Sequence, residues 1–129
     1  MIERVRLTAG ARSQLSALKR KTGIAHNNAI CRHALCVSLA NPSRIPNEKL
    51  DFTNGLEIDW RTFTGGYESL YYNLLVTRLM QDGGPINADS ILSALILHVH
   101  RGLSYLSSKR DADLSLELAR SLVVTAKVT

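Results

Sequence analysis

Seven basic side chains in the first third of the chain have the type and spacing to bind phosphate groups. Guanidinium and ammonium groups form strong charge-assisted hydrogen bonds with phosphate oxygens. Three of the seven are consecutive, and contacts of this kind hold the backbone of a nucleic acid without reading its bases. The candidate phosphate-binding residues are Arg4, Arg6, Arg12, Lys19, Arg20, Lys21 and Arg32.

Basic residues are concentrated near the N-terminus of this 129-residue chain. Residues 1–44 contain eight arginines and lysines and a single acid, Glu3, so this segment has a net charge of +7. Residues 45–129 contain eight cations and ten acids, a net charge of −2, and the whole chain carries +5. A cationic cluster attracts polyanions, and nucleic acid is the commonest polyanion inside a cell. The charge distribution therefore predicts a nucleic-acid-binding surface in the first third.

The histidines and cysteines do not have the spacing of an enzyme active site or a metal centre. His98 and His100 are two positions apart on an expected helix, so they point to roughly opposite sides. His33 and Cys36 share a helix face, but a zinc site needs a second pair of Cys or His ligands. We therefore predict no metal site.

Acidic and glycine-rich segments of the C-terminal half fit structural roles. Asp111, Asp113 and Glu117 surround an expected helix start, where carboxylates stabilise the helix dipole. Gly83-Gly84-Pro85 is a turn between helices and lacks the lysine of a phosphate-binding loop. With no nucleophile, base or nucleotide site in view, we predict a protein that is not an enzyme, without catalytic residues or cofactor.

The first residues have the alternating pattern of a short strand. In residues 2–8, Val5 and Leu7 point to one side, and Arg4 and Arg6 point to the other. The first side requires a hydrophobic core, whereas the second presents two guanidinium groups to solvent or to a ligand.

Two helices are expected after this strand. Thr8 is the predicted N-cap of a helix over residues 9–21, and Gly23 is its predicted C-cap. A second helix is predicted over residues 26–40, because an apolar face continues until Asn41-Pro42 ends it.

The rest of the chain is expected to form a connector and a helical extension. The connector contains an Asn54-Gly55 turn, followed by an alternating segment that predicts a short strand or hairpin. The predicted parts of the chain are a module over residues 1–42, a connector over 43–66 and an extension over 67–129. The extension is predicted to contain helices over residues 67–81, 88–107 and 112–126.

A strand followed by two helices has the order of a ribbon-helix-helix module. A lone strand leaves backbone groups open along its edge, and the usual solution pairs it with its copy in a second chain. Alternate strand side chains then enter a DNA groove, which would place Arg4 and Arg6 of both chains on one surface. Backbone N–H groups near Asn27 and Asn28 would face a phosphate. The predicted fold class is mainly α, with a ribbon-helix-helix-like N-terminal module and additional C-terminal helices.

A structural interpretation of the same residues remains open. Small domains that never bind DNA also begin with a strand and two helices, and in them Arg4 and Arg6 would simply be solvated. Lys19, Arg20 and Lys21 would then be a solvated helix end, where cations stabilise the helix dipole.

The cysteines and the N-terminus favour a cytoplasmic protein. Cys31 and Cys36 lie about 140° apart around the second expected helix, so they cannot easily bridge and are expected to be structural. The N-terminus has no apolar segment typical of a signal peptide, and no apolar run is long enough to span a membrane. Free thiols without an export signal predict a reducing compartment.

The sequence resembles the DNA sulfur modification (phosphorothioation) protein DndE family. The resemblance is carried by residues 2–8 (IERVRLT), 18–24 (LKRKTGI) and 31–40 (CRHALCVSLA), and continues more loosely through 60–63 (WRTF) and Gly65-Gly66. It is strongest over residues 1–42. The resemblance implies a role in DNA phosphorothioation, in which sulfur replaces a non-bridging phosphate oxygen. It also implies work beside a cysteine desulfurase, a sulfur-transfer enzyme and an ATPase.

The predicted function is largely sequence-independent binding of double-stranded DNA as a small subunit of the phosphorothioation machinery. The resemblance implies a homotetramer that favours nicked duplexes. It also implies that the partners are the sulfur-transfer and ATPase subunits of this machinery. Two alternatives remain: a ribbon-helix-helix transcriptional regulator or antitoxin, and a protein–protein adaptor within the modification complex. The regulator would bind one operator far more tightly than random DNA.

Overall fold

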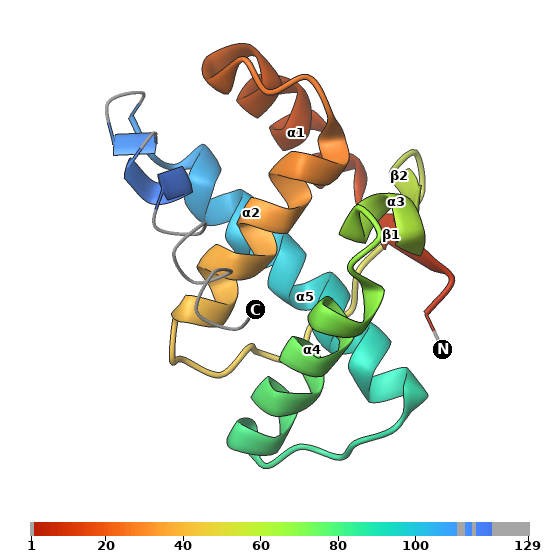
Figure 1. Cartoon of the computed structure of the whole chain (residues 1–129). Helices are drawn as coiled ribbons and strands as arrows, with labels where there is room; N and C mark the ends of the chain where they lie inside the picture. The colour runs from red at the N-terminus through yellow and green to blue at the C-terminus, as the bar shows by residue number, and fades with distance from the viewer. Residues whose placement is uncertain (1, 111–112, 115, 120–129) are drawn as a thin grey trace.

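The computed structural model describes residues 2–110, 113–114 and 116–119, and they are mainly helical (Figure 1). A predicted helix is confirmed over each of the four stretches that begin near residues 9, 26, 67 and 88. Residues 113–114 and 116–119 are also helical, whereas residues 112, 115 and 120–126 of the last predicted helix lie outside the described residues. The elements are β1 (Arg4–Leu7), α1 (Ala9–Thr22), α2 (Asn27–Ala40), β2 (Leu56–Asp59), α3 (Trp60–Thr64), α4 (Glu68–Asp82) and α5 (Ala88–Ser107).

Helix α1 begins and ends where its capping residues predict. The Thr8 side chain accepts a hydrogen bond from the backbone N–H of Ala11, and Gly23 ends the helix in the left-handed conformation with φ 75°. The predicted apolar stripe is buried, as shown by Ala11, Leu15 and Leu18. This stripe fixes α1 against the core and turns its basic residues outward.

Helix α5 forms the centre of the molecule and contacts α1, α2, α4 and β1. Figure 1 shows α1 beside one part of α5 and α4 beside another. The crossing with α2 is very close, because a Cβ atom added at Gly102 would lie only 1.8 Å from the carbonyl oxygen of Ala34. Only glycine therefore allows this approach of the two backbones.

The strand β1 has a partner within its own chain. It pairs antiparallel with β2, and the register places Arg4 opposite Asp59 and Arg6 opposite Glu57. The ribbon-helix-helix prediction, in which β1 pairs with its copy in a second chain, is not confirmed, because β2 supplies the strand that β1 lacked. The predicted strand after Asn54-Gly55 is present, but β1 is its partner, so it does not form a local hairpin.

The pairing of β1 with β2 joins the first and second of the three predicted parts. Gly55 lies at this junction, because a Cβ atom there would come within 1.8 Å of the Leu7 carbonyl oxygen. The short helix α3, which has no signal in the sequence pattern, continues directly from β2 and brings Trp60 and Phe63 into the core. The division of the chain into a module, a connector and an extension at residues 42 and 66 stays a prediction.

Two arginines from other helices cap the C-terminal end of α2. Arg78 of α4 donates to the carbonyl oxygen of Leu39 at 3.0 Å and to that of Ser43 at 2.8 Å. Arg101 of α5 donates to the carbonyl oxygens of Ser38 and Ser43, each at 2.7 Å. Carbonyls at the end of a helix have no partner within it, and they lie at the negative end of its dipole. The two guanidinium groups therefore tie α4 and α5 to α2.

A buried histidine completes this junction. The Nε–H of Arg101 donates to Ser38 Oγ at 2.8 Å, and the Ser38 hydroxyl forms a second hydrogen bond, also of 2.8 Å, with Nδ1 of His98. Burial, together with the charges of Arg78 and Arg101, lowers the pKa of His98 to about 3. His98 is therefore neutral in the folded protein at physiological pH.

The neutral state of His98 predicts a loss of stability in mild acid. In the unfolded chain a histidine takes up a proton near pH 6.5, whereas His98 in the folded protein does not, so the free energy of unfolding falls below that pH. Between pH 7.5 and 5 the expected loss from this residue is on the order of 2 kcal/mol. Urea unfolding at a series of pH values measures it.

The substitution His98→Asn isolates this contribution, because an Asn amide can hydrogen-bond the Ser38 hydroxyl as donor or acceptor but does not titrate. We expect its unfolding free energy to depend less on pH than that of the wild-type protein. The matched control, His26→Asn at an exposed position, should retain the wild-type dependence. Equal pH dependence in all three proteins would contradict the assignment.

Candidate nucleic-acid interface

Four of the seven predicted phosphate-binding residues lie on α1. Arg12 is in its first turn, and Lys19, Arg20 and Lys21 form its last turn. Arg12, Arg20 and Lys21 are exposed and Lys19 is half-buried. The buried stripe explains this placement, since Arg20 lies on the side of the helix opposite the core and the other three lie on its flanks.

The positive charge of α1 is not balanced within the helix or by an ion pair among the described residues. The helix contains no Asp or Glu. Among the described residues, no acidic side chain forms an ion pair with Arg12, Lys19, Arg20 or Lys21. We call these four residues the α1 basic face; it can attract a polyanion.

The two arginines of β1 have acidic neighbours. In an antiparallel pair, directly opposed residues project from the same face, so Arg4 and Arg6 share the outer face with Glu57 and Asp59. Arg4 Nη1 lies 3.6 Å from Glu57 Oε1, and both side chains are largely exposed. This sheet face therefore carries two positive and two negative groups.

Arg6 and Arg32 also contact the protein itself. The Arg6 guanidinium carbon lies 5.0 Å from the centre of the Phe52 ring, a cation–π arrangement. Arg32 is half-buried on α2, and its Nη1 donates to the Phe63 carbonyl oxygen at 2.8 Å, which joins α2 to α3.

The structure thus places the seven residues in three locations rather than one. Arg4 and Arg6 lie on the sheet, and Arg32 lies on α2 against α3. The α1 basic face extends along a helix of 14 residues, about 21 Å in length. Its last turn is the end of α1 remote from β1, as Figure 1 shows. The α1 basic face is the most strongly cationic of the three locations, because it has four cations and none of them forms an ion pair among the described residues.

Comparison with known proteins identifies the family to which this arrangement belongs. Residues 4–113 match the family described as DNA sulphur modification protein DndE. The chain belongs to the DndE family. The match includes both strands, all of α1 and α2, and the helices α3 to α5.

A solved structure of a DndE protein has the same fold as this DndE-family chain. It is the crystal structure of DndE from Escherichia coli B7A, which is involved in DNA phosphorothioation modification. The TM-score is 0.67 and the sequence identity is 23%, with 81% of this chain and 97% of that chain covered. No curated protein sequence matches the chain.

The thiols of the DndE-family chain are buried and do not form a disulfide. Cys31 and Cys36 are free, as predicted from their separation around α2. Burial raises the pKa of Cys31 to about 12, so this thiol stays protonated at physiological pH. Because the thiolate is the nucleophile, Cys31 is unsuited to sulfur chemistry in this environment.

The histidines singled out in the sequence also have structural partners. His100 Nδ1 donates to the Ile96 carbonyl oxygen at 2.7 Å, and its Nε2 accepts the backbone N–H of Thr8 at 3.1 Å. Burial lowers the pKa of His100, in agreement with this neutral, accepting state. Within the described residues, no group of three His, Cys, Asp or Glu side chains could hold a metal ion.

The predicted capping acids are only partly described. Asp111 lies outside the described residues, whereas Asp113 lies 3.4 Å from Arg110 and Glu117 is buried. At the start of α2, Asn28 Nδ2 donates to the Thr62 carbonyl oxygen at 3.0 Å, so it links α2 to α3. No helix in the described part of the chain combines the length and apolar character needed to cross a membrane.

Arg78 and Arg101 are important residues that sequence reasoning missed. Arg78 occupies a position of the buried α4 stripe, seven residues after Tyr71 and three after Leu75. A charged residue at a core position of an otherwise apolar face indicates a buried partner, and that signal was available in the sequence. The hydrogen bonds of Arg78 and Arg101 to carbonyl oxygens at the end of α2 could not be deduced from the sequence.

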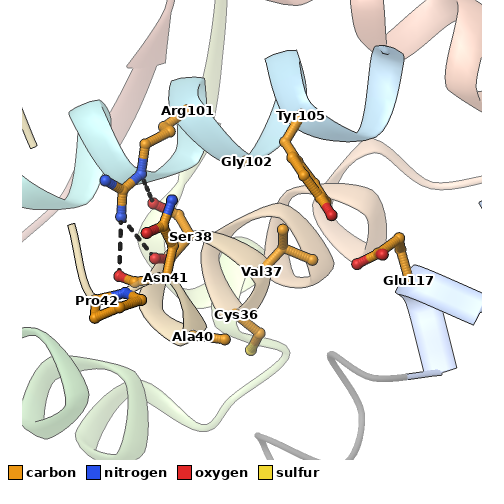
Figure 2. A pocket seen from close by; sticks show the side chains of 10 residues that line it. All are labelled: Cys36, Val37, Ser38, Ala40, Asn41, Pro42, Arg101, Gly102, Tyr105 and Glu117. Atoms are coloured by element: carbon orange, nitrogen blue, oxygen red, sulfur yellow. Dashed lines mark hydrogen bonds between the residues drawn. The ribbon is translucent and has the colours of Figure 1, made fainter. Parts of the chain in front are cut away.

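A cavity of about 350 Å³ lies beside this junction (Figure 2). It is lined by residues of α2 and α5, by Asn41 and Pro42 after the end of α2, and by Glu117. Figure 2 shows the Arg101 guanidinium turned to the carbonyl groups of Ser38 and Asn41, and the Cys36 side chain pointing away from Arg101. Ser38 lines the cavity and hydrogen-bonds Nδ1 of His98 at 2.8 Å, but burial lowers the pKa of His98 to about 3, so this histidine is a weak base for activating the hydroxyl.

Proposed function

We propose that this chain binds double-stranded DNA through its phosphate backbone, as a non-catalytic subunit of the DNA phosphorothioation machinery. The observation that carries the proposal is the α1 basic face, a cationic surface on a helix that contains no acid, with no ion pair to its cations among the described residues. Family membership supplies the biochemical context, because the matching family is named for DNA sulphur modification. The other predicted contacts, Arg4, Arg6 and Arg32, are secondary in this proposal.

The binding is largely independent of base sequence. Lysine and arginine side chains at a helix end contact phosphates, which position a protein on DNA but carry no sequence information. Such a subunit can hold any duplex, including a nicked one, while partner subunits perform the sulfur chemistry. The proposed partners are the sulfur-transfer enzyme and the ATPase of the same system, and the proposed location is the cytoplasm.

Assembly into a homotetramer strengthens this binding. Several copies of a modest cationic patch on one particle bind a duplex far more tightly than one copy, because later contacts form at a high effective concentration. The edge of β1 that β2 occupies is not available for this assembly.

A salt series with unrelated duplexes tests the proposed function. We expect the affinities of several 20-base-pair duplexes of unrelated sequence to agree within about threefold, and to fall steeply with salt as bound counterions are released. A duplex bound about 10³-fold more tightly than the others would support the sequence-specific regulator instead. No binding at low salt, with capture of the sulfur-transfer enzyme or the ATPase, would support the adaptor.

The sheet arginines are expected to matter less than the α1 basic face. Arg4→Ala with Arg6→Ala should weaken duplex binding by about threefold or less, because Glu57 and Asp59 already offset these charges. Lys19→Ala with Arg20→Ala removes the same formal charge and should weaken binding by at least about tenfold and reduce the salt slope by nearly two. Fluorescence anisotropy measures both. A larger loss for the sheet variant would contradict the proposal, because the DNA would then contact the sheet rather than α1.

A further inference from the structure

The α1 basic face has two levels of charge separated by a gap. Arg12 stands at one level, and Lys19 and Arg20 stand seven and eight residues later, about 10–12 Å further along the helix axis. Arg12 and Lys19 differ by only about 20° around the helix, so they project from the same side. The face is therefore a pair of cationic positions rather than a continuous row.

A short side chain lies in the gap between the two levels. Ser16 is exposed about 6 Å beyond Arg12 along the axis, and its hydroxyl donates to the Arg12 carbonyl oxygen at 3.3 Å. No cation lies between Arg12 and Lys19 on this helix. A phosphate placed midway would therefore face no positive charge.

This spacing matches the distance between two DNA strands better than the spacing along one strand. The minor groove is about 6 Å wide, which puts the phosphates on its two walls about 12 Å apart when their own size is included. Across a groove there is no phosphate at the midpoint. Along one strand, in contrast, an intervening phosphate would face Ser16, which carries no charge.

We infer that α1 bridges the two strands of a duplex across the minor groove, with Arg12 on one strand and Lys19 and Arg20 on the other. This inference rests on the proposed function and makes it more specific: the ligand is a double strand with both backbones charged. Affinity then depends on the position of the cations as well as on their number.

Moving one cation along the helix tests the inference at constant net charge. In the variant Arg12→Ala with Ser16→Arg, the first cation moves to within about 5 Å of the Lys19 level along the axis. We expect this variant to bind duplex DNA about tenfold more weakly than the wild-type protein, as weakly as Arg12→Ala alone. Circular dichroism and urea unfolding establish that it is folded.

A duplex with one uncharged strand provides the second arm. Neutral methylphosphonate linkages replace every phosphate of one strand, and the effect of Arg12→Ala is measured on both duplexes. Bridging predicts about a tenfold effect on the natural duplex and less than about a twofold effect on the half-neutral one, because Arg12 has then already lost its partner.

The outcomes separate this inference from the proposed function. Wild-type affinity in the relocated variant, or an equal effect of Arg12→Ala on both duplexes, would overturn bridging and leave backbone binding intact. Absence of duplex binding by the wild-type protein would overturn both.

Discussion

Replacing Lys19, Arg20 and Lys21 by glutamate is expected to abolish binding to duplex DNA at low salt. The change converts three positive charges into three negative ones at the end of α1, where no acidic side chain in the described structure forms an ion pair with them. Each lost phosphate contact lowers the logarithmic salt slope by about 0.9, and the new carboxylates repel the backbone. We expect an affinity loss of at least about 100-fold, measured by anisotropy at 50 mM salt. The size of the assembly should not change.

Two controls make this result specific. Arg44→Glu with Lys49→Glu and Arg61→Glu changes the net charge equally at exposed positions outside the proposed site, and should retain most of the affinity. Because carboxylates at a helix C-terminus are unfavourable, the neutral variant Lys19→Gln with Arg20→Gln and Lys21→Gln repeats the test without that effect. Equal losses in the site and control variants would show that net charge alone governs binding.

The substitution Gly102→Ala is expected to have the largest effect on stability. Its Cβ atom would lie 1.8 Å from the Ala34 carbonyl oxygen and 2.4 Å from its carbonyl carbon, so the backbones of α2 and α5 would have to separate. Overpacking of a core typically costs 1–3 kcal/mol, and a clash with main chain lies at the upper end of that range. We expect the free energy of unfolding to fall by about 3 kcal/mol in urea titrations.

The same chemical change at Gly10 serves as the control. A Cβ atom there would meet only Thr8 Oγ1, at 3.8 Å, and Gly10 lies in the first turn of α1. Alanine is favoured over glycine in helices by up to about 1 kcal/mol, so Gly10→Ala should leave stability unchanged or raise it slightly. If Gly102→Ala were as stable as the wild-type protein, the close crossing of α2 and α5 would be contradicted.

Local signals in the sequence were sufficient for the helices but not for the sheet. The start of α1 follows from Thr8 and its end from Gly23, because capping depends on groups within a few residues. The pairing of β1 with β2 joins residues about 50 positions apart, and periodicity does not reveal the partner of a strand. Helix α3, with five residues, is too short to show a helical period.

The basic residues illustrate a second limit. Their number and clustering were visible in the sequence, but their neighbours were not. Arg4 lies beside Glu57 and Arg32 bonds to Phe63 only because of long-range packing. The α1 basic face could be predicted more completely, since the apolar stripe of one helix determines which of its residues face outward.

The most direct measurement of the central claim is a nuclear magnetic resonance titration of the 14.2 kDa chain with a short duplex of arbitrary sequence. We expect the largest amide shifts in α1, from Arg12 to Thr22, and we expect them to disappear as salt is raised. Shifts concentrated on α4 or the sheet, with α1 unaffected, would contradict it.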